Sequence, residues 1–243
     1  MMLSVDSPWR TSVGVSKCSI LARSGKLPES PAWHRPAPSN PQCSPIRFAF
    51  VYGSAVFPQK SRPLARPRAS PPPIRDFVFP VSHPGHWHSI NLHHNPHHYL
   101  LAARLVNSPA IASLQEHALG AGLWFNLRAN VSQTVIKYGV VSVDTLCNDL
   151  LDWNTLCLSG RMHKPIDILR DHPRARLAQH ANLVPALRTA LLLLPERFDA
   201  LVLFRPVAGL SYTGDFRMRF AESPHKVNNI VAGQTATINC SLI

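Results

Sequence analysis

The pattern of apolar and polar residues predicts two short buried strands near the start of the folded part of the chain. Residues 48–52 form a continuous apolar run, which is typical of a buried strand. The run ends at Gly53-Ser54, where glycine permits a tight turn and a close approach of a phosphate to the backbone. Residues 76–81 form a second strand, and Pro80 indicates that it ends early or lies at an edge.

Two longer segments show helical periodicity. Residues 143–158 place apolar side chains on one face, with Ser142 as a cap and Gly160 as the end of the helix. Residues 183–194 form a second helix, whose apolar stripe we expect to lie in the core. The weaker patterns predict a short helix at 107–120, strands at 123–126 and 135–141, a helix start at 226–231, and no helical pattern over 235–243.

The pattern also divides the chain into three parts. Residues 1–45 lack periodicity and are rich in Ser, Pro and Arg, which suits an organelle transit peptide, a disordered tail or an error in the coding sequence. We expect a nucleotide-handling domain at 46–165 and a helical domain at 166–243. Within the first domain, residues 60–73 form a basic, proline-rich loop, either plain surface or a neighbour of a phosphate site.

Composition adds little to this picture and excludes some classes of protein. The net charge of the 243 residues is +12, but the first 75 residues hold eleven of the 25 Lys and Arg and two of the 13 acids. The basicity therefore belongs to the leader and is poor support for nucleic-acid binding. Five scattered cysteines without a CxxC pair disfavour a disulfide framework or a zinc site. Apolar runs such as 190–194 are far too short to span a bilayer.

A cluster of histidines follows the second strand. Its spacing matches no standard zinc pattern and brings no cysteine, so we expect most of these side chains to face solvent. Trp87, His88 and Asn91 are better candidates for specific roles. The cluster holds seven of the 13 histidines: His83, His86, His88, His93, His94, His97 and His98.

The candidate chemistry lies where the two early strands end and begin. A strand, a Gly-Ser turn and an acidic residue on a neighbouring strand form the ground plan of nucleotidyltransferase sites. Gly53 and Ser54 would hold the phosphates of a nucleotide, and Asp76 would hold the metal ion that neutralises them. Val78 stands where such sites often carry a second carboxylate. Taken alone, the pattern equally fits a strand that ends in a turn.

Three basic residues are further candidates. Lys137 lies within an apolar strand, so it must reach solvent, pair with an acid or serve the site. Arg161 and Lys164 follow the helix predicted at 143–158, where they would either favour the helix dipole or clamp a phosphate.

Eight segments closely resemble the mitochondrial phosphatidate cytidylyltransferase family. They occur in family order and cover roughly residues 48–234. The segments are VYGSAVFPQ (51–59), DFVFPVSHPGHWHSINLHHNPHHY (76–99), GAGLWFN (120–126), IKYGVVSVDTL (136–146), DLLDWNTLCLSGRMHKP (149–165), NLVPALRTALLLLPERF (182–198), GLSYTGDFRM (209–218) and KVNNIV (226–231).

The resemblance implies an α/β fold: a nucleotidyltransferase-type domain with a mixed sheet, followed by a helical, winged-helix-like domain. It implies transfer of CMP from CTP to phosphatidic acid, giving CDP-diacylglycerol for cardiolipin synthesis and releasing pyrophosphate. It also implies a need for magnesium, a peripheral position on the matrix side of the mitochondrial inner membrane, and no nucleic-acid partner. Asp215, in the matching GDFRM segment, is the candidate for the second metal-binding carboxylate.

The resemblance leaves two alternatives. Family members continue well beyond the KVNNIV segment, so we expect the second domain to be truncated here. The chain would then be either a working cytidylyltransferase or an inactive homologue that acts as an assembly partner at the inner membrane. A nucleic-acid-directed nucleotidyltransferase is a third reading, against which the resemblance argues.

Overall fold

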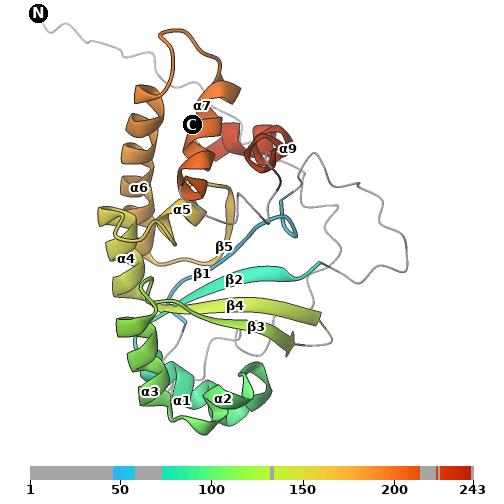
Figure 1. The fold of residues 1–243 in the computed structure, drawn as a ribbon, viewed down its shortest axis with the longest axis vertical. Helices are drawn as coiled ribbons and strands as arrows, with labels where there is room; N and C mark the ends of the chain where they lie inside the picture. Colours follow the sequence, from blue (N-terminus) through green and yellow to red (C-terminus); the bar gives the residue numbers. More distant parts are fainter. Residues whose placement is uncertain (1–45, 58–72, 132–133, 214–222, 224, 242–243) are drawn as a thin grey trace, which may run out of the picture. The chain divides into compact units, whose positions relative to one another are not determined.

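A five-stranded mixed sheet lies at the centre of the fold, in the strand order β3-β4-β2-β1-β5 (Figure 1). The computed structural model describes residues 46–57, 73–131, 134–213, 223 and 225–241. All of them belong to one compact unit, Ala37–Ile243. Strands β2 and β4 are parallel, and the other neighbouring strands are antiparallel. The strands are β1 Ala49–Tyr52, β2 Arg75–Val81, β3 Trp124–Val131, β4 Thr134–Ser142 and β5 Ile166–Arg170. The predicted α/β class with a mixed sheet is confirmed.

The central position of β2 corrects the prediction for Pro80. This proline neither ends β2 nor lies at an edge, because β2 is hydrogen-bonded to β4 and β1 on its two sides. The Pro80 carbonyl accepts hydrogen bonds from the amides of Arg47 and Phe48. The nitrogen of Pro80 points to the same side as its carbonyl and lacks a hydrogen atom to donate. The lost hydrogen bond therefore lies at the end of the pairing between β2 and the segment that leads into β1. A proline is tolerated there because it removes only a terminal bond of the ladder.

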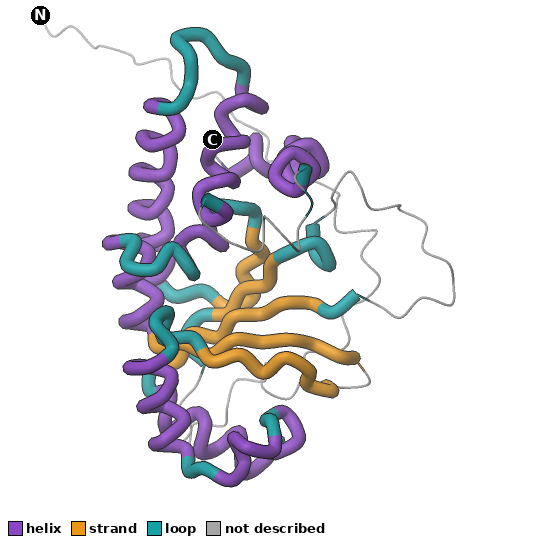
Figure 2. The backbone as a smooth tube through the Cα atoms, viewed as in Figure 1, coloured by secondary structure: helices purple, strands orange, loops and turns teal. Residues whose placement is uncertain are grey.

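Helices cover both faces of this sheet (Figure 2). One layer consists of short helices between β2 and β3, and it is joined to the sheet by a hydrogen bond from Asn91 to Tyr138. The opposite layer packs Leu146, Leu150 and Met162 against Phe50 and Val78 of the sheet. The first layer comprises α1 Pro84–His94, the 3-10 helix η3 Pro96–His98, α2 Leu101–Leu105, α3 Ser108–Ser113 and the π-helix η4 Leu114–Ala118. The second comprises α4 Val143–Asp152, α5 Ser159–Met162 and α6 Pro173–Leu192.

Helix α4 begins as predicted but ends earlier. The Ser142 hydroxyl accepts a hydrogen bond from the Thr145 amide and caps the helix. The helix then stops at Asp152 because Trp153 takes up a left-handed conformation, with φ of 55°. The predicted end at Gly160 is therefore wrong, and Gly160 lies inside α5.

Asp149 explains why the chain leaves the helix. Its buried carboxylate accepts hydrogen bonds from the backbone amides of Thr155, Leu158 and Ser159. Burial opposes ionisation of Asp149, but these hydrogen bonds outweigh it and lower the pKa of the carboxyl group. The charged carboxylate thus replaces the helical bonds that this segment gives up.

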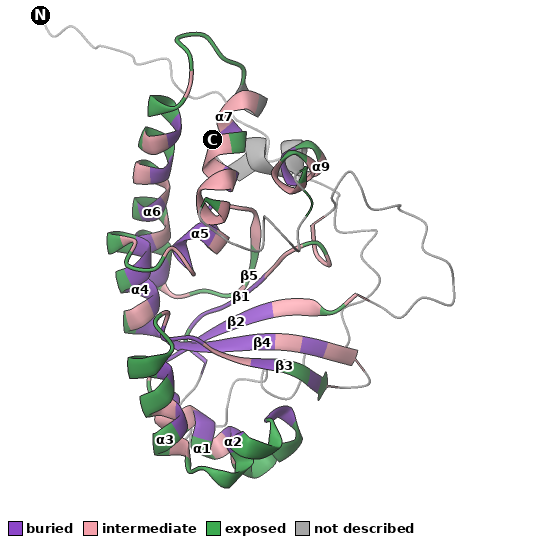
Figure 3. Cartoon of the chain, viewed as in Figure 1, coloured by how far each residue is buried: buried purple, intermediate pink, exposed green. Residues whose placement is uncertain are grey.

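Helix α6 is longer and less buried than the prediction. It starts at Pro173, and Ala186 and Ala190 of the predicted stripe are buried. Leu187 and Leu191 are 38% and 44% exposed. The stripe is thus only partly core, which Figure 3 shows as alternating buried and exposed turns of α6.

The C-terminal helices form a small cluster of their own. Helix α7 Ala200–Gly209, the 3-10 helix η5 Leu210–Tyr212 and helix α9 Lys226–Ser241 follow α6. Phe204 and Ala208 pack against Val231, with Val227 beside them. The helix start at 226–231 is confirmed. The expectation of no helix over 235–243 is wrong, because α9 continues to Ser241.

Two predictions about organisation stay predictions. The winged-helix-like arrangement and the domain boundary at 165–166 are not tested, and β5, just after that boundary, is hydrogen-bonded to β1. The leader at 1–45 and most of the loop at 60–73 lie outside the described residues. Among the helices described, none combines the length and apolar character needed to cross a membrane.

Candidate active site

Neighbouring strands place three polar side chains in one row across the sheet. Asp76 of β2 is opposite Lys137 of β4 on one side and opposite Tyr52 of β1 on the other. Ile166 of β5 is opposite Tyr52 and continues the row. Side chains of directly paired residues point to the same face of a sheet. Phe50 and Val78 lie two residues before Tyr52 and two residues after Asp76 on the same strands, so their side chains share this face. Both pack against the helical layer of α4, α5 and α6, which therefore covers this face.

Asp76 and Lys137 form an ion pair within this row. The Lys137 Nζ lies 3.6 Å from Asp76 Oδ1, and the two side chains are 31% and 32% exposed. The same Nζ lies 4.6 Å from the centre of the Phe125 ring, a distance typical of a cation–π contact. Of the three roles predicted for Lys137, the structure shows pairing with an acid. Partial exposure leaves both charged groups accessible to a ligand.

The Gly-Ser turn lies directly beside Asp76, as the sequence predicted. Gly53 has a φ of 89°, which favours glycine. Its carbonyl accepts hydrogen bonds from the amides of Val56 and Phe57, which form a turn. A Cβ atom at Gly53 would lie 3.6 Å from Asp76 Oδ2. Ser54 is exposed at the top of this turn.

Arg161 reaches the row from α5. Its Nε donates a hydrogen bond to the Tyr52 hydroxyl at 3.2 Å, and its Nη1 donates to the sulfur and carbonyl of Cys157. The guanidinium lies 5.8 Å from the ring centre of Tyr52 and 5.7 Å from that of Phe125. Burial alone would lower the pKa of Arg161, but Tyr52 and Cys157 outweigh it and raise this pKa. The group stays cationic beside Tyr52.

Lys164 lies further along the same segment. Its Nζ donates a hydrogen bond to the Ser211 hydroxyl at 2.6 Å and lies 4.6 Å from the centre of the Tyr212 ring. Burial, and then the nearby cations Arg161 and Lys226, lower the pKa of Lys164 to about 7. Helix α4 ends at Asp152, well before Arg161 and Lys164, so the predicted contact of these two residues with the dipole of that helix is wrong. The phosphate clamp stays a prediction.

One carboxylate of the predicted metal site is present in the described residues. Asp76 presents two oxygens at the row, and oxygen ligands suit magnesium, which is often held by one or two carboxylates together with phosphates and water. Asp215, the predicted second ligand, lies outside the described residues. Among the residues that are described, no three His, Cys, Asp or Glu side chains group closely enough to hold a metal ion. The donor set thus fits a magnesium ion shared with a phosphate.

Comparison with known proteins shows to which family the chain belongs. A family model described as "Phosphatidate cytidylyltransferase, mitochondrial" matches residues 41–240. The chain belongs to this family. Curated proteins of the same name from Drosophila melanogaster and Danio rerio are 44% and 43% identical over 198 and 186 residues. The protein of that name from Saccharomyces cerevisiae is 39% identical over 193 residues.

These matches differ in how much of each chain they cover. They extend over 78%, 76% and 77% of this chain, and over 57%, 54% and 48% of the fly, zebrafish and yeast relatives. The chain therefore spans about half the length of the curated relatives that it matches.

Two residues of the candidate site, Tyr52 and Phe125, were not predicted from the sequence. Tyr52 orients Arg161, and Phe125 lies under both Lys137 and Arg161. For Tyr52 a signal existed, because it is the last residue of its strand, directly before the Gly-Ser turn. For Phe125 there was none, since its apolar side chain looks like any other strand residue.

Proposed function

We propose that the chain catalyses the reaction for which its relatives are named, the transfer of CMP from CTP to phosphatidic acid. An oxygen of the lipid phosphate attacks the α-phosphorus of CTP and forms a new phosphorus–oxygen bond. The bond between the α-phosphorus and the bridging oxygen breaks, and its electron pair leaves with pyrophosphate. The products are CDP-diacylglycerol and pyrophosphate, and no covalent enzyme intermediate is needed.

The observation that carries this proposal is the row Lys137–Asp76–Tyr52 with its glycine turn. Both substrates are anions, so the site must reduce their mutual repulsion. Lys137 provides a cation paired with Asp76, and Arg161 provides a second one bound to the neighbouring Tyr52. The turn at Gly53-Ser54 lies next to that carboxylate, where a glycine backbone can approach phosphates closely.

The metal dependence is part of the same proposal. Asp76, with Asp215 as the second candidate ligand, would hold magnesium, which neutralises the phosphates of CTP when bound. Lys164 lies beyond Arg161 and adds a further cation for the lipid phosphate or for pyrophosphate. These groups act by positioning and charge.

The setting of the reaction follows from its substrates. Phosphatidic acid is a membrane lipid, so we propose that the protein works at a membrane surface. The relatives are named as mitochondrial proteins. We propose that this surface is the matrix side of the inner membrane and that the product serves cardiolipin synthesis. We expect no nucleic-acid partner.

The test is formation of CDP-diacylglycerol by the full chain from CTP, phosphatidic acid and magnesium. We expect activity that falls at least a hundredfold in Asp76→Asn, which keeps the size of the side chain and removes its charge. Asp167→Asn is the matched control, because Asp167 is an exposed residue of β5 that pairs with Val51, in the next row and on the opposite face. Wild-type protein that binds CTP and phosphatidic acid without turnover would refute the proposal. Equal loss in both variants would refute the role of Asp76.

A further inference from the structure

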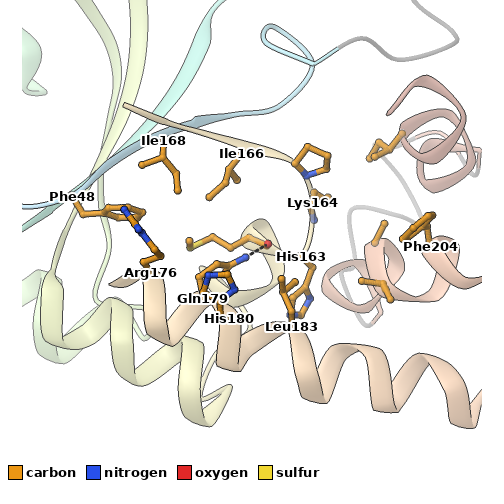
Figure 4. Close-up of a pocket in the computed structure, with 15 residues that line it drawn as sticks. Phe48, His163, Lys164, Ile166, Ile168, Arg176, Gln179, His180, Leu183 and Phe204 are labelled. Atoms are coloured by element: carbon orange, nitrogen blue, oxygen red, sulfur yellow. Dashed lines mark hydrogen bonds between the residues drawn. The ribbon is translucent and has the colours of Figure 1, made fainter. Parts of the chain in front are cut away.

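A mostly apolar cavity of about 260 Å³ lies between β5 and the helices α6, α7 and α9 (Figure 4). In the close-up, Ile166 and Ile168 project from β5 toward α6. Leu183 and Gln179 project from the opposite wall, and Gln179 is bound to the Met162 carbonyl. The larger apolar side chains of the lining include Phe48, Ile166, Ile168, Leu183, Phe204 and Ile230.

Lys164 lies in the wall of this cavity. Its charge has no carboxylate partner in the described part of the chain, where Ser211 is its hydrogen-bond acceptor. Among the described residues, the charges that act on Lys164 are those of Arg161 and Lys226, which are also cations. A partly buried cation beside other cations is stabilised when an anion joins it. The wall of an apolar cavity therefore carries a place for an anionic group.

The cavity borders the candidate active site through one shared residue. Ile166 lines it and also continues the row of Asp76 and Tyr52. Since Ile166 and Asp76 are two strands apart, their backbones are separated by about 10 Å. Arg161 connects the two places, because it binds Tyr52 and acts on the charge of Lys164. A molecule with an anionic head and an apolar tail fits this arrangement.

We propose that the cavity receives part of an acyl chain of the phosphatidate substrate, with the lipid phosphate between Lys164 and Arg161. This inference rests on the proposed function and adds the place and orientation of the lipid. An apolar cavity of about 150 Å³ holds the six carbons of benzene, so 260 Å³ has room for about ten carbons. The remaining carbons of a long chain would stay outside.

The test measures binding of soluble phosphatidates to the full chain without CTP, by calorimetry. Dioctanoyl phosphatidate should bind at least tenfold more tightly than dibutyryl phosphatidate, because each buried methylene tightens binding about fourfold. Ile168→Trp should abolish this difference, since Ile168 is 42% exposed and lines the cavity. Leu127→Trp is the control, because Leu127 is 55% exposed on β3 and does not line the cavity. Lys164→Gln should weaken both lipids alike.

Each outcome decides the inference. Equal binding of both lipids by the wild-type protein would overturn it, and so would an unchanged preference in a folded Ile168→Trp variant. Leu183→Phe, from the opposite wall, provides a second blocking variant if the first one unfolds. Chain-length-dependent binding without CDP-diacylglycerol formation would support the cavity and refute the proposed function. Turnover with equal binding of short-chain and long-chain phosphatidates would support the proposed function and refute the role of the cavity.

Discussion

The two faces of the sheet treat polar side chains in opposite ways. Between α1 and the sheet, buried neutral side chains bind one another: Asn91 donates to the hydroxyls of Tyr99 and Tyr138, and those hydroxyls bind His88 and His98. On the other face, Asp76, Lys137, Arg161 and Lys164 are charged, and cations outnumber the carboxylate. Hydrogen bonds between buried neutral groups stabilise a fold, whereas an excess of charge of one sign favours a ligand of the other sign.

The hydrogen bonds around His88 also fix which of its nitrogens carries the proton. Gln115 donates from Nε2 to the Gly122 carbonyl, so its Oε1 must accept from His88 Nε2. His88 Nδ1 then accepts from the Tyr99 hydroxyl. The network is therefore complete only while His88 is neutral, and burial lowers the pKa of His88 to about 4.

The largest effect that we expect from this comparison is a loss of stability in acid. Unfolded histidine has a pKa near 6.5, and folded His88 has a pKa of about 4. Its contribution is complete above pH 6.5 and is lost as the pH falls, since the unfolded chain binds the proton first. The loss reaches on the order of 3 kcal/mol near pH 4. His163, whose pKa is also lowered to about 4 by burial, adds in the same direction.

Urea unfolding at pH 7 and pH 5 measures this loss. His88→Gln should reduce the difference between the two free energies of unfolding by about 2 kcal/mol, because it removes the titrating group. His93→Gln provides the control, since His93 is exposed on the same helix. If both variants kept the wild-type pH dependence, the histidine would not be the cause.

The next effect concerns the turn at the charged face. Gly53→Ala should cost about 1–2 kcal/mol in stability, because alanine disfavours positive φ. It should also raise the KM for CTP several-fold, since the added methyl group would contact Asp76. Gly120→Ala has the same sign of φ and no heavy atom within 4 Å of the added Cβ. We expect it to reduce stability without changing the KM. Equal KM values in the two variants would contradict a phosphate-binding role for the Gly53 turn.

The smallest effect tests the charge of Lys164. With its pKa lowered to about 7, Lys164 loses its charge above neutral pH, so kcat/KM for phosphatidate should fall by up to about fivefold between pH 7 and pH 8. Lys164→Arg should flatten this part of the profile, because arginine stays protonated. A fall of the same size in the arginine variant would assign the titration to another group.

Local patterns in the chain predicted much of the sheet. The apolar runs placed β1, β2 and β4, and the capping Ser142 placed the start of α4. The patterns did not predict the end of a helix where a side chain accepts the hydrogen bonds that backbone carbonyls would otherwise accept. The carboxylate of Asp149 ends α4 early, although nothing in the apolar spacing indicates it.

The sequence by itself determined which residues carry the chemistry: a glycine turn after one strand, a carboxylate on another, and basic residues in a later segment. Only the tertiary structure decided that they meet. Strand register places Asp76 between Lys137 and Tyr52, and Arg161 binds Tyr52 from 109 residues away in the chain. Such contacts depend on which strands pair and on which helices cover them, and those choices minimise the free energy of the whole core. No single segment encodes them.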